Sequence, residues 1–362
     1  MHSSGDLLAD RRYAYAEASF REGDLEAAAD LARQTVEIAP RFAPAWFLLG
    51  EAREAQYRAA RSTDEGVEAY REAVKAFEMA LLRDPEDAQG ARLRLASLGI
   101  GDPLEAMSPD YIRRLFDDYA VRFDRHLTVS LKYRAPEVLH EAVRRAASCG
   151  LRDFRFARAL DLGCGTGLAG EVFRPVCGHL AGVDLSPAMV ERARRKKVYD
   201  ELAAGELVEW LSGRPDASAD LVLATDVFVY VADLAPVFSE AARVLARGGL
   251  LGFTVQDHEG RGVVLGGDMR YAHAQEHILE LAVEAGLRLL LSEAGGMGGG
   301  GGEALPGGGV GGGGWGRFPP PAERGGGWGR MGGSPGGGGA GGGGGGPPPP
   351  PAASGGGRRG RR

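Results

Sequence analysis

From Phe154 onward, short aliphatic or β-branched runs alternate with segments of helical period, and this alternation limits the possible folds more than any other feature. Chains of this kind form a mainly parallel sheet with helices on both faces. We predict strands over residues 158–163, 179–186, 205–211, 219–231, 248–256 and 287–294, and helices over 167–176, 186–203, 234–247 and 271–286. Ligands of such sheets bind beyond the carboxyl ends of the strands, so the residues that follow the strands are the candidate site.

The composition excludes several classes of protein. A hydrophobic content of 44% and a charged content of 25% are typical of a soluble globular chain. The net charge of -6 argues against binding to nucleic acid, which needs a basic face. No apolar run is long enough to span a bilayer, and the N-terminus lacks the pattern of a signal peptide. Three cysteines without metal-ligand spacing indicate reduced thiols in a cytoplasmic protein and no metal site.

A glycine-rich loop follows the first predicted strand, in the sequence "DLGCGTG" from Asp161 to Gly167. Glycines let a loop adopt unusual dihedral angles and approach a ligand closely. Residues 165–170 also satisfy the dinucleotide pattern GxGxxG, so NAD is an alternative. However, a carboxylate at Asp161 would repel a pyrophosphate and pair with a cationic amino group. The next predicted strand ends at Asp184, which can accept hydrogen bonds from both ribose hydroxyls.

The loop and its surroundings resemble a known enzyme family. "LDLGCGTG" (160–167) followed by "GVDLSPAMVERA" (182–193) is similar to the first two motifs of the class I S-adenosylmethionine-dependent methyltransferases. The segments 219–231 and 241–255 agree with the fourth strand and the helix-to-strand turn of that family. Residues 116–139, 196–202 and 270–287 resemble, more narrowly, predicted methyltransferases preceded by tetratricopeptide repeats. The resemblance extends to about residue 291 and implies a Rossmann-like α/β sheet that binds S-adenosylmethionine.

The resemblance implies a set of cofactor contacts. In it Asp161 faces the amino group, Asp184 binds the ribose hydroxyls and Glu206 takes the place of the usual adenine-contacting Asp. Two of these acids have structural alternatives, because Asp161 could cap the turn and Asp184 could cap the next helix. The full set of implied cofactor-binding residues is Tyr119, Asp161, Gly163, Cys164, Gly165, Gly167, Asp184, Leu185, Ser186, Met189, Glu206, Leu207, Thr225 and Asp226.

The chemistry of methyl transfer needs orientation more than acid–base catalysis, and a base depends on the acceptor. The candidates for a general base are His273 and Tyr230, followed by His126. His273 could instead orient its loop or cap a helix. Arg270 could pair with an acidic acceptor or be a solvated surface residue. No "NPPY"-type signature of amino-group methylation follows the fourth strand, which favours a small molecule or a carboxyl or hydroxyl group as the acceptor.

The first part of the chain is helical in period and repeats itself. Residues 15–46 and 43–89 each read as a helix pair closed by a proline, and they resemble the tetratricopeptide repeat of about 34 residues. About eleven extra residues in the second copy lengthen its helices or its turn. Such pairs must stack to bury their apolar faces. The resemblance leaves two roles open, namely gripping a protein partner and packing or self-association.

The segment between the repeats and the sheet is also helical, with Ser108-Pro109 and Pro136 as helix starts. Its aromatic residues either pack the junction or form the roof of a ligand site below. These residues are Tyr111, Phe116, Tyr119, Phe123 and Tyr133.

The end of the chain is rich in glycine and proline after Glu293, and it has too few aliphatic side chains to offset the cost of ordering it. We predict a disordered tail, and we expect the sheet to lack the antiparallel seventh strand that class I methyltransferases place beside the fifth. The predicted organisation is helical repeats over 1–106, a helical linker and cap over 107–150, the methyltransferase domain over 151–294 and the tail over 295–362.

The sequence thus predicts a cytoplasmic methyltransferase that uses S-adenosylmethionine, with the repeats as a protein-interaction or self-association module. Its acceptor is unidentified, and membranes and nucleic acids are not expected partners. The alternative is a non-catalytic cofactor-binding scaffold, which the missing strand would favour.

Overall fold

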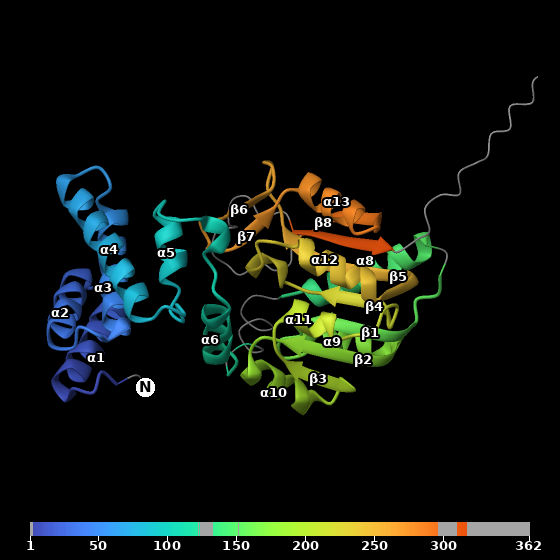
Figure 1. Ribbon diagram of the computed structural model, residues 1–362, viewed down its shortest axis with the longest axis horizontal. Coiled ribbons are helices and arrows are strands. Elements are labelled where there is room, and N and C mark those ends of the chain that lie inside the picture. The colour runs from blue at the N-terminus through green and yellow to red at the C-terminus, as the bar shows by residue number, and fades with distance from the viewer. Residues whose placement is uncertain (1–2, 122, 124–132, 151, 296–309, 317–362) are drawn as a thin grey trace, which may run out of the picture. The chain divides into compact units, whose positions relative to one another are not determined.

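A twisted sheet with five parallel strands at its centre positions the site (Figure 1). The computed structural model describes residues 3–121, 123, 133–150, 152–295 and 310–316. The strands lie side by side in the order β3-β2-β1-β4-β5, all parallel. The strand order therefore reverses between β1 and β4, where α/β sheets place their ligands. The bounds are β1 Phe156–Leu162, β2 Cys177–Asp184, β3 Glu201–Ala204, β4 Ala219–Ala224 and β5 Leu245–Gln256.

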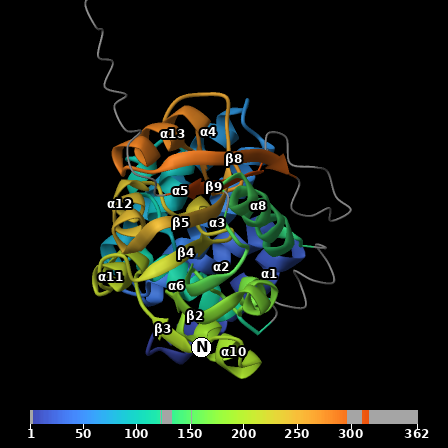
Figure 2. The same ribbon diagram turned by 90° about the vertical axis from the view of Figure 1, so that its right-hand side faces the viewer.

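Helices cover both faces of the sheet, as predicted (Figure 2). In β4, Leu221 and Leu223 pack into one apolar cluster while Val222 and Ala224 pack into the other. Strands buried on both faces are continuous apolar runs for this reason. The first face is covered by α8 (Ala135–Cys149) and α9 (Leu168–Phe173), and the second by α11 (Leu207–Ser212), α12 (Ala235–Val244) and α13 (Gln275–Glu284).

The predicted strand over 205–211 is wrong, and so is the length of the helix before it. Helix α10 (Pro187–Lys196) is followed by Lys197, whose left-handed φ of 56° ends the helix, and β3 begins at Glu201. Residues 207–212 then form α11, because the Glu206 carboxylate accepts a hydrogen bond from the Glu209 N–H group and caps the helix. The apolar residues of this segment have helical as well as strand spacing.

Three other predicted boundaries also shift. The predicted strand over 219–231 ends at Ala224, and Phe228–Tyr230 form a short 3-10 helix. Strand β5 begins at Leu245, inside the predicted helix over 234–247. The predicted helix over 271–286 begins as a strand, β7 (Tyr271–His273), which pairs with β5 and, as a hairpin, with β6 (Val263–Leu265). Helix α13 starts only at Gln275.

The predicted absence of a seventh strand is wrong. Residues 310–316, "VGGGGWG", form β9 inside the segment predicted to be a disordered tail. β9 is antiparallel to both β5 and β8 (Arg288–Gly295), so it lies between them. Glycine weakens a strand but keeps the N–H and C=O groups that a ladder needs. The two strands beside it supply those hydrogen bonds on both sides.

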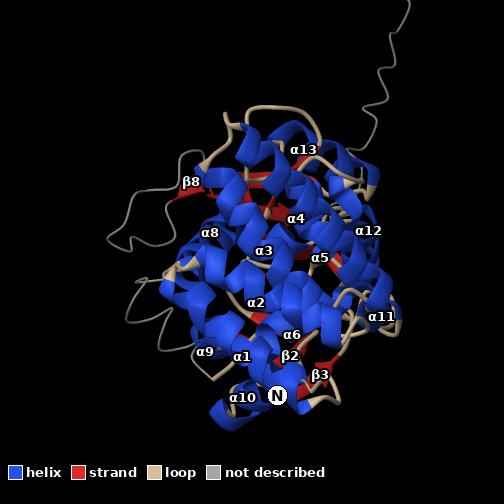
Figure 3. Cartoon of the chain, turned by 90° about the vertical axis from the view of Figure 1, so that its left-hand side faces the viewer, coloured by secondary structure: helices blue, strands red, loops and turns tan. Residues whose placement is uncertain are grey.

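The described residues before Ser97 form helices alone (Figure 3). Helices α1 and α2 pack as one pair and α3 and α4 as the next, around alanines that are fully buried, such as Ala28, Ala45 and Ala73. The second pair is the longer one. The bounds are α1 Leu7–Glu22, α2 Leu25–Ile38, α3 Ala43–Ala59, α4 Asp64–Arg83 and α5 Ala91–Ser97.

The linker contains α6 (Pro109–Tyr119), which Ser108 caps by accepting a hydrogen bond from the Tyr111 N–H group. Helix α8 starts with Pro136 in its first turn, as expected. Residues 1–319 form a single compact unit, and the boundaries predicted inside it stay predictions. Residues 317–362 of the tail lie outside the described residues. No helix in the described part of the chain is long and apolar enough to cross a membrane.

Candidate active site

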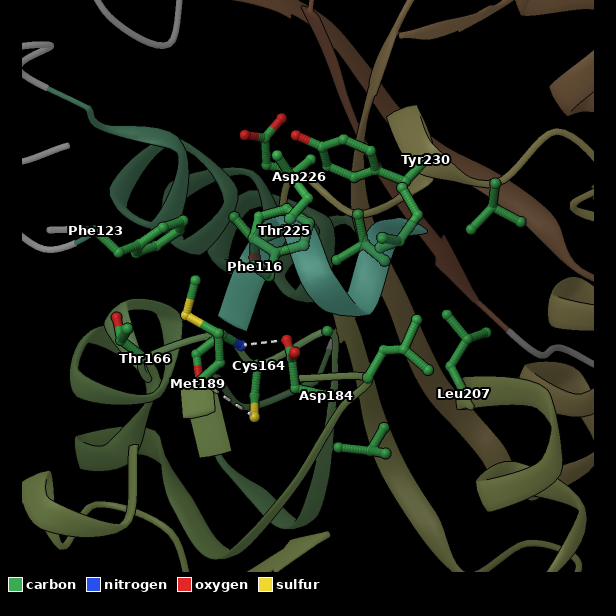
Figure 4. Close-up of a pocket in the computed structure, with 18 of the residues that line it drawn as sticks. Phe116, Phe123, Cys164, Thr166, Asp184, Met189, Leu207, Thr225, Asp226 and Tyr230 are labelled. Carbon is green, nitrogen blue, oxygen red and sulfur yellow. Dashed lines mark hydrogen bonds between the residues drawn. The ribbon is translucent and has the colours of Figure 1, made fainter. Parts of the chain in front are cut away.

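A cavity of about 570 Å³ lies beyond the carboxyl ends of β1, β2 and β4, under α6 (Figure 4). This volume is within the usual range for small-molecule sites. Most of the residues that the sequence singled out lie in its wall. They are Tyr119, Gly163, Cys164, Gly165, Asp184, Leu185, Met189, Glu206, Leu207, Thr225, Asp226 and Tyr230.

The first part of the wall, which we name the loop end, comprises Gly163, Gly165 and Asp184. The two carboxylate oxygens of Asp184 accept hydrogen bonds from the N–H groups of Gly165 and Ser186, each at 2.8 Å. Figure 4 shows the first of these as a dashed line. Each oxygen keeps a second lone pair, so Asp184 can hold the loop and still accept hydrogen bonds from a ligand. Burial raises the pKa of Asp184 to about 6.

Asp161 does not line the cavity, contrary to the prediction that it faces the ligand. Its side chain is fully buried beneath the loop, where Oδ2 accepts a hydrogen bond of 2.6 Å from the Tyr199 hydroxyl. Oδ1 has no hydrogen-bond partner among the described residues. Burial raises the pKa of Asp161 to about 7, and the bond from Tyr199 opposes that rise.

The three glycines of the loop have different reasons to be glycine, although all have positive φ. A Cβ atom at Gly163 would lie 2.4 Å from Val227, and one at Gly167 would lie 3.0 Å from the Tyr199 ring. At Gly165 the nearest atom would be a carbon of Phe123 at 4.0 Å. Only Gly165 therefore leaves open space toward the cavity. Gly167, which was predicted to contact the cofactor, makes room for Tyr199 and does not line the cavity.

Two further predicted site residues lie outside the cavity wall. Ser186 is fully buried and caps α10, because its Oγ accepts a hydrogen bond from the Met189 N–H group. His273 is fully buried in β7, with Nε2 3.0 Å from the Phe228 carbonyl oxygen. Burial lowers the pKa of His273. The structure therefore favours the interpretation that His273 orients its segment over its assignment as a general base. His126 lies outside the described residues.

Helix α6 forms the roof of the cavity and is fastened to α10. The Asp117 carboxylate accepts hydrogen bonds from the Ser186 hydroxyl at 2.5 Å and from the Ala188 N–H group at 3.2 Å. Phe116 packs edge to face on Tyr230, with ring centroids 5.2 Å apart. Of the five aromatic residues of the linker, Phe116, Tyr119, Phe123 and Tyr133 line the cavity. The interpretation that aromatics form the roof thus holds for all of them except Tyr111.

The opposite part of the wall, which we name the Arg270 end, comprises Tyr133, Asp226, Tyr230 and Arg270. Figure 4 shows the Asp226 carboxylate and the Tyr230 hydroxyl at the same end of the cavity. Asp226 has a φ of 58°, a conformation that costs about 1 to 2 kcal/mol for a non-glycine residue. Its N–H group donates a 2.8 Å hydrogen bond to Thr254 Oγ1, which holds this turn in place. Strain of this kind indicates a functional position.

The phenols of Tyr133 and Tyr230 and the thiol of Cys164 are protonated at neutral pH. Burial raises the pKa of Tyr230 to about 12 and that of Tyr133 well above its usual value. Burial, together with the charges of Asp161 and Asp184, raises the pKa of the Cys164 thiol. Tyr230 is therefore a hydrogen-bond donor and not a ready base, and Cys164 fills space in the loop rather than acting as a nucleophile.

Residues 160–253 match a family model described as "Methyltransferase domain". The chain carries a class I S-adenosylmethionine-dependent methyltransferase domain. The match runs from β1 to β5 and so includes the glycine loop, Asp184 and the turn at Asp226.

Curated relatives match parts of the chain. A trans-aconitate 2-methyltransferase of Rhizobium rhizogenes is 31% identical over 106 residues, which are 29% of this chain and 40% of that protein. A malonyl-[acyl-carrier protein] O-methyltransferase of Yersinia pestis is 28% identical over 144 residues, or 40% of this chain and 52% of that protein. The chain thus spans about half or less of the length of these relatives. The solved structure of the N-methyltransferase NodS of Bradyrhizobium japonicum, in complex with S-adenosyl-L-homocysteine, is 18% identical, covering 57% of this chain and 98% of that one, with a TM-score of 0.44.

The residues of the methyltransferase domain fit S-adenosylmethionine. Asp184 retains lone pairs for ribose hydroxyls, Gly165 leaves open space beside it, and apolar Met189 and Leu207 stand in the same wall. Thr225, also in the wall, has a buried Oγ1 with no partner among the described residues. An orphaned buried hydroxyl is a group that a ligand can satisfy.

Sequence reasoning missed three residues of the site. Tyr199 and Asp117 support the site through hydrogen bonds without lining the cavity, and Val227 lines it with an apolar side chain. Tyr199 lies in the "KKVYDEL" segment that carried part of the family resemblance. The sequence therefore indicated that this segment matters, but it did not indicate the role of Tyr199. Asp117 also lies in a segment of the resemblance (116–139), but its role could not be seen because its partners on α10 are distant in the sequence.

Proposed function

We propose that the protein is an S-adenosylmethionine-dependent methyltransferase that acts on a small-molecule acceptor with a carboxyl or hydroxyl group. The observation that carries this proposal is the meeting of Gly165 and Asp184 in one cavity, with room for a ligand above the glycine. When bound, S-adenosylmethionine supplies a methyl group on a positively charged sulfur that is already a good leaving group. The chain then has to bind the two substrates, orient them and exclude water.

Each part of the cavity wall has a role in this proposal. Asp184 holds the ribose, and the wall formed by Met189 and Leu207 holds the adenine. Thr225 and Asp226 lie beside the sulfonium, and the α6 roof excludes water. The acceptor class is supported by the relatives that methylate trans-aconitate and malonyl-[acyl-carrier protein], which are both acids.

The alternative of a non-catalytic scaffold was favoured by the expected absence of a seventh strand. Because β9 is that strand, this argument for the scaffold no longer applies. We further propose that α1–α5 bind a protein partner or a second copy of the chain, which their stacked helix pairs support. A cytoplasmic location is supported by the free thiols of Cys149, Cys164 and Cys177.

The test is a calorimetric titration of the full-length protein with S-adenosylmethionine, followed by detection of S-adenosylhomocysteine with a panel of acceptors. We expect saturable binding and acceptor-dependent turnover. Absence of cofactor binding would refute the proposal, and binding without turnover for any acceptor would restore the scaffold.

A further inference from the structure

Arg270 is a partly buried arginine of the cavity wall, and its surroundings differ from those of several other partly buried arginines. Arg94, Arg174 and Arg243 each form an ion pair of 2.6 to 2.7 Å. Arg270 lines the cavity, and within the described residues no ion pair is recorded for it. Burial disfavours a charged guanidinium, and the carboxylates of Asp226 and Asp268 favour its charge from a distance, without a recorded ion pair. The cavity therefore contains a cation that a ligand can neutralise.

The backbone around Arg270 is fixed, so the position of its side chain is built into the fold. Its carbonyl oxygen accepts a 2.7 Å hydrogen bond from the Gly266 N–H group, and Met269 takes a left-handed φ of 61°. These contacts close the hairpin between β6 and β7. The guanidinium carbon lies 5.7 Å from the centre of the Tyr230 ring. Arg270 is thus directed along an aromatic wall and not into solvent.

The charges nearby indicate which substrate this cation serves. Asp226 is close enough for Arg270 to lower the pKa of its carboxyl, although burial, the larger effect, raises that pKa. A methyl donor with a positive sulfur is attracted by Asp226 and repelled by Arg270. Arg270 consequently suits an anionic group of the other substrate, and the apolar roof at Phe116 suits an apolar body.

We propose that the Arg270 end is a binding subsite for the carboxylate of the methyl acceptor, so that the substrate is a small carboxylic acid. The guanidinium binds the carboxylate, and the protonated hydroxyls of Tyr133 and Tyr230 are additional donors. This inference rests on the proposed methyltransferase function and deepens it by naming the acceptor class.

The same assignment requires no general base at this end of the cavity. An oxygen of the acceptor carboxylate forms the bond to the methyl carbon while the carbon–sulfur bond breaks and its electron pair goes to sulfur. The products are a methyl ester and a neutral thioether, and no proton moves. The two opposite charges disappear together, which a cavity of low polarity favours. A buried His273 outside the wall agrees with this reaction.

The test uses benzoate, phenylacetate and hexanoate, with the matching amides and alcohols as uncharged counterparts. Calorimetry measures their binding to the full-length protein saturated with S-adenosylhomocysteine, and labelled S-adenosylmethionine measures transfer. We expect acids alone to bind and to give alkali-labile methyl esters. Arg270→Met should weaken acid binding at least about tenfold, since a hydrogen-bonded charge is lost, and Arg270→Lys should weaken it less.

The matched control is Arg158→Met, at an exposed position on the first residues of β1, which should bind like the wild type. The proposal is overturned if no acid binds, if alcohols are methylated as well as acids, or if Arg270→Met binds acids normally. It is also overturned if Arg270→Met weakens S-adenosylmethionine as much as the acids, because Arg270 would then hold the cofactor's own carboxylate. A wild type that does not bind S-adenosylmethionine speaks against the proposed function instead.

Discussion

At the loop end of the cavity, both oxygens of Asp184 are held by backbone N–H groups, whereas at the Arg270 end no ion pair of the guanidinium is recorded among the described residues. The loop end comes from one continuous stretch of β1, β2 and their loops. The Arg270 end combines a turn after β4, the hairpin of β6 and β7, and the linker. The difference indicates that the protein preorganises the part that binds a common cofactor and leaves the part that binds its own substrate to be completed by that substrate.

The largest expected effect tests whether Asp184 organises the loop end. Asp184→Asn removes the charge that two N–H groups and the ribose share. We expect S-adenosylmethionine to bind about 100-fold more weakly, because each charge-assisted hydrogen bond is worth about 1.5 to 3 kcal/mol. Calorimetry measures the dissociation constant. Asp153→Asn, at an exposed position before β1, is the control, and equal affinity in the two variants would remove Asp184 from the site.

A smaller loss of S-adenosylmethionine affinity is expected when the Tyr199 hydroxyl beneath the glycine loop is removed. Tyr199→Phe keeps the ring that Gly167 and Gly170 accommodate but removes the hydrogen bond to Asp161. We expect S-adenosylmethionine to bind about tenfold more weakly, since the buried carboxyl then has no donor. The pH at which binding weakens should also move upward, because the bond lowers the pKa of Asp161.

If Tyr199 has a purely structural role, Tyr199→Phe should lower the melting temperature without changing the pH dependence of S-adenosylmethionine binding. Tyr15→Phe, on an exposed part of α1, is the matched control. An unchanged pH dependence of binding in Tyr199→Phe would show that the ionisation of Asp161 does not affect cofactor binding.

The pH dependence of stability sharpens the comparison further. Burial raises the pKa of Asp161 to about 7 and of Asp184 to about 6, above the usual 3.8. The stability that these carboxyls contribute is full below their unfolded pKa and is lost as pH rises through their folded pKa values. We therefore expect the melting temperature of the free protein to fall from about pH 4 to about pH 7 on their account.

S-adenosylmethionine should reverse this trend, because its positive charge favours the ionised carboxylates. The rise in melting temperature that it causes should grow over the same pH range. A rise that is independent of pH would show that neither acid is linked to cofactor binding.

The smallest expected effect concerns the roof that both ends share. Asp117→Ala removes two hydrogen bonds between α6 and the start of α10. We expect both S-adenosylmethionine and the acceptor to bind about three- to tenfold more weakly, because hydrogen bonds to a carboxylate contribute about 1.5 to 3 kcal/mol each to holding the roof, and only part of this loss affects the ligands. Asp118→Ala, one residue along the same helix and exposed, should bind both normally. A loss confined to one ligand would mean that the roof serves only one end.

The sequence was sufficient to predict the loop end and most of the parallel sheet, because both depend on local patterns. Apolar runs mark β1, β2 and β4, and the residues after them carry the chemistry. The strand predicted over 205–211 failed because the capping of α11 by Glu206 leaves no signature in the apolar spacing. His273 was misplaced for a different reason, since its position near the carboxyl ends of the strands says nothing about which way the ring points.

The Arg270 end was less predictable. The sequence left two alternatives for Arg270, an acidic acceptor or solvent, and the choice between them depends on where the nearby carboxylates lie in the folded chain. The fastening of α6 by Asp117 depends on residues 69 and 71 positions away in the sequence. Contacts of this kind become visible only when the chain is folded.

Strand β9 has a consequence for how the sheet is specified. Its central residues are four consecutive glycines, so sliding it by one position would replace glycine with glycine along most of its length. Side-chain alternation, which normally penalises such a slip, is almost absent here. The glycines of β9 therefore contribute little to its alignment between β5 and β8, and replacing alternate glycines with valine would give the strand the side-chain alternation that specifies a register.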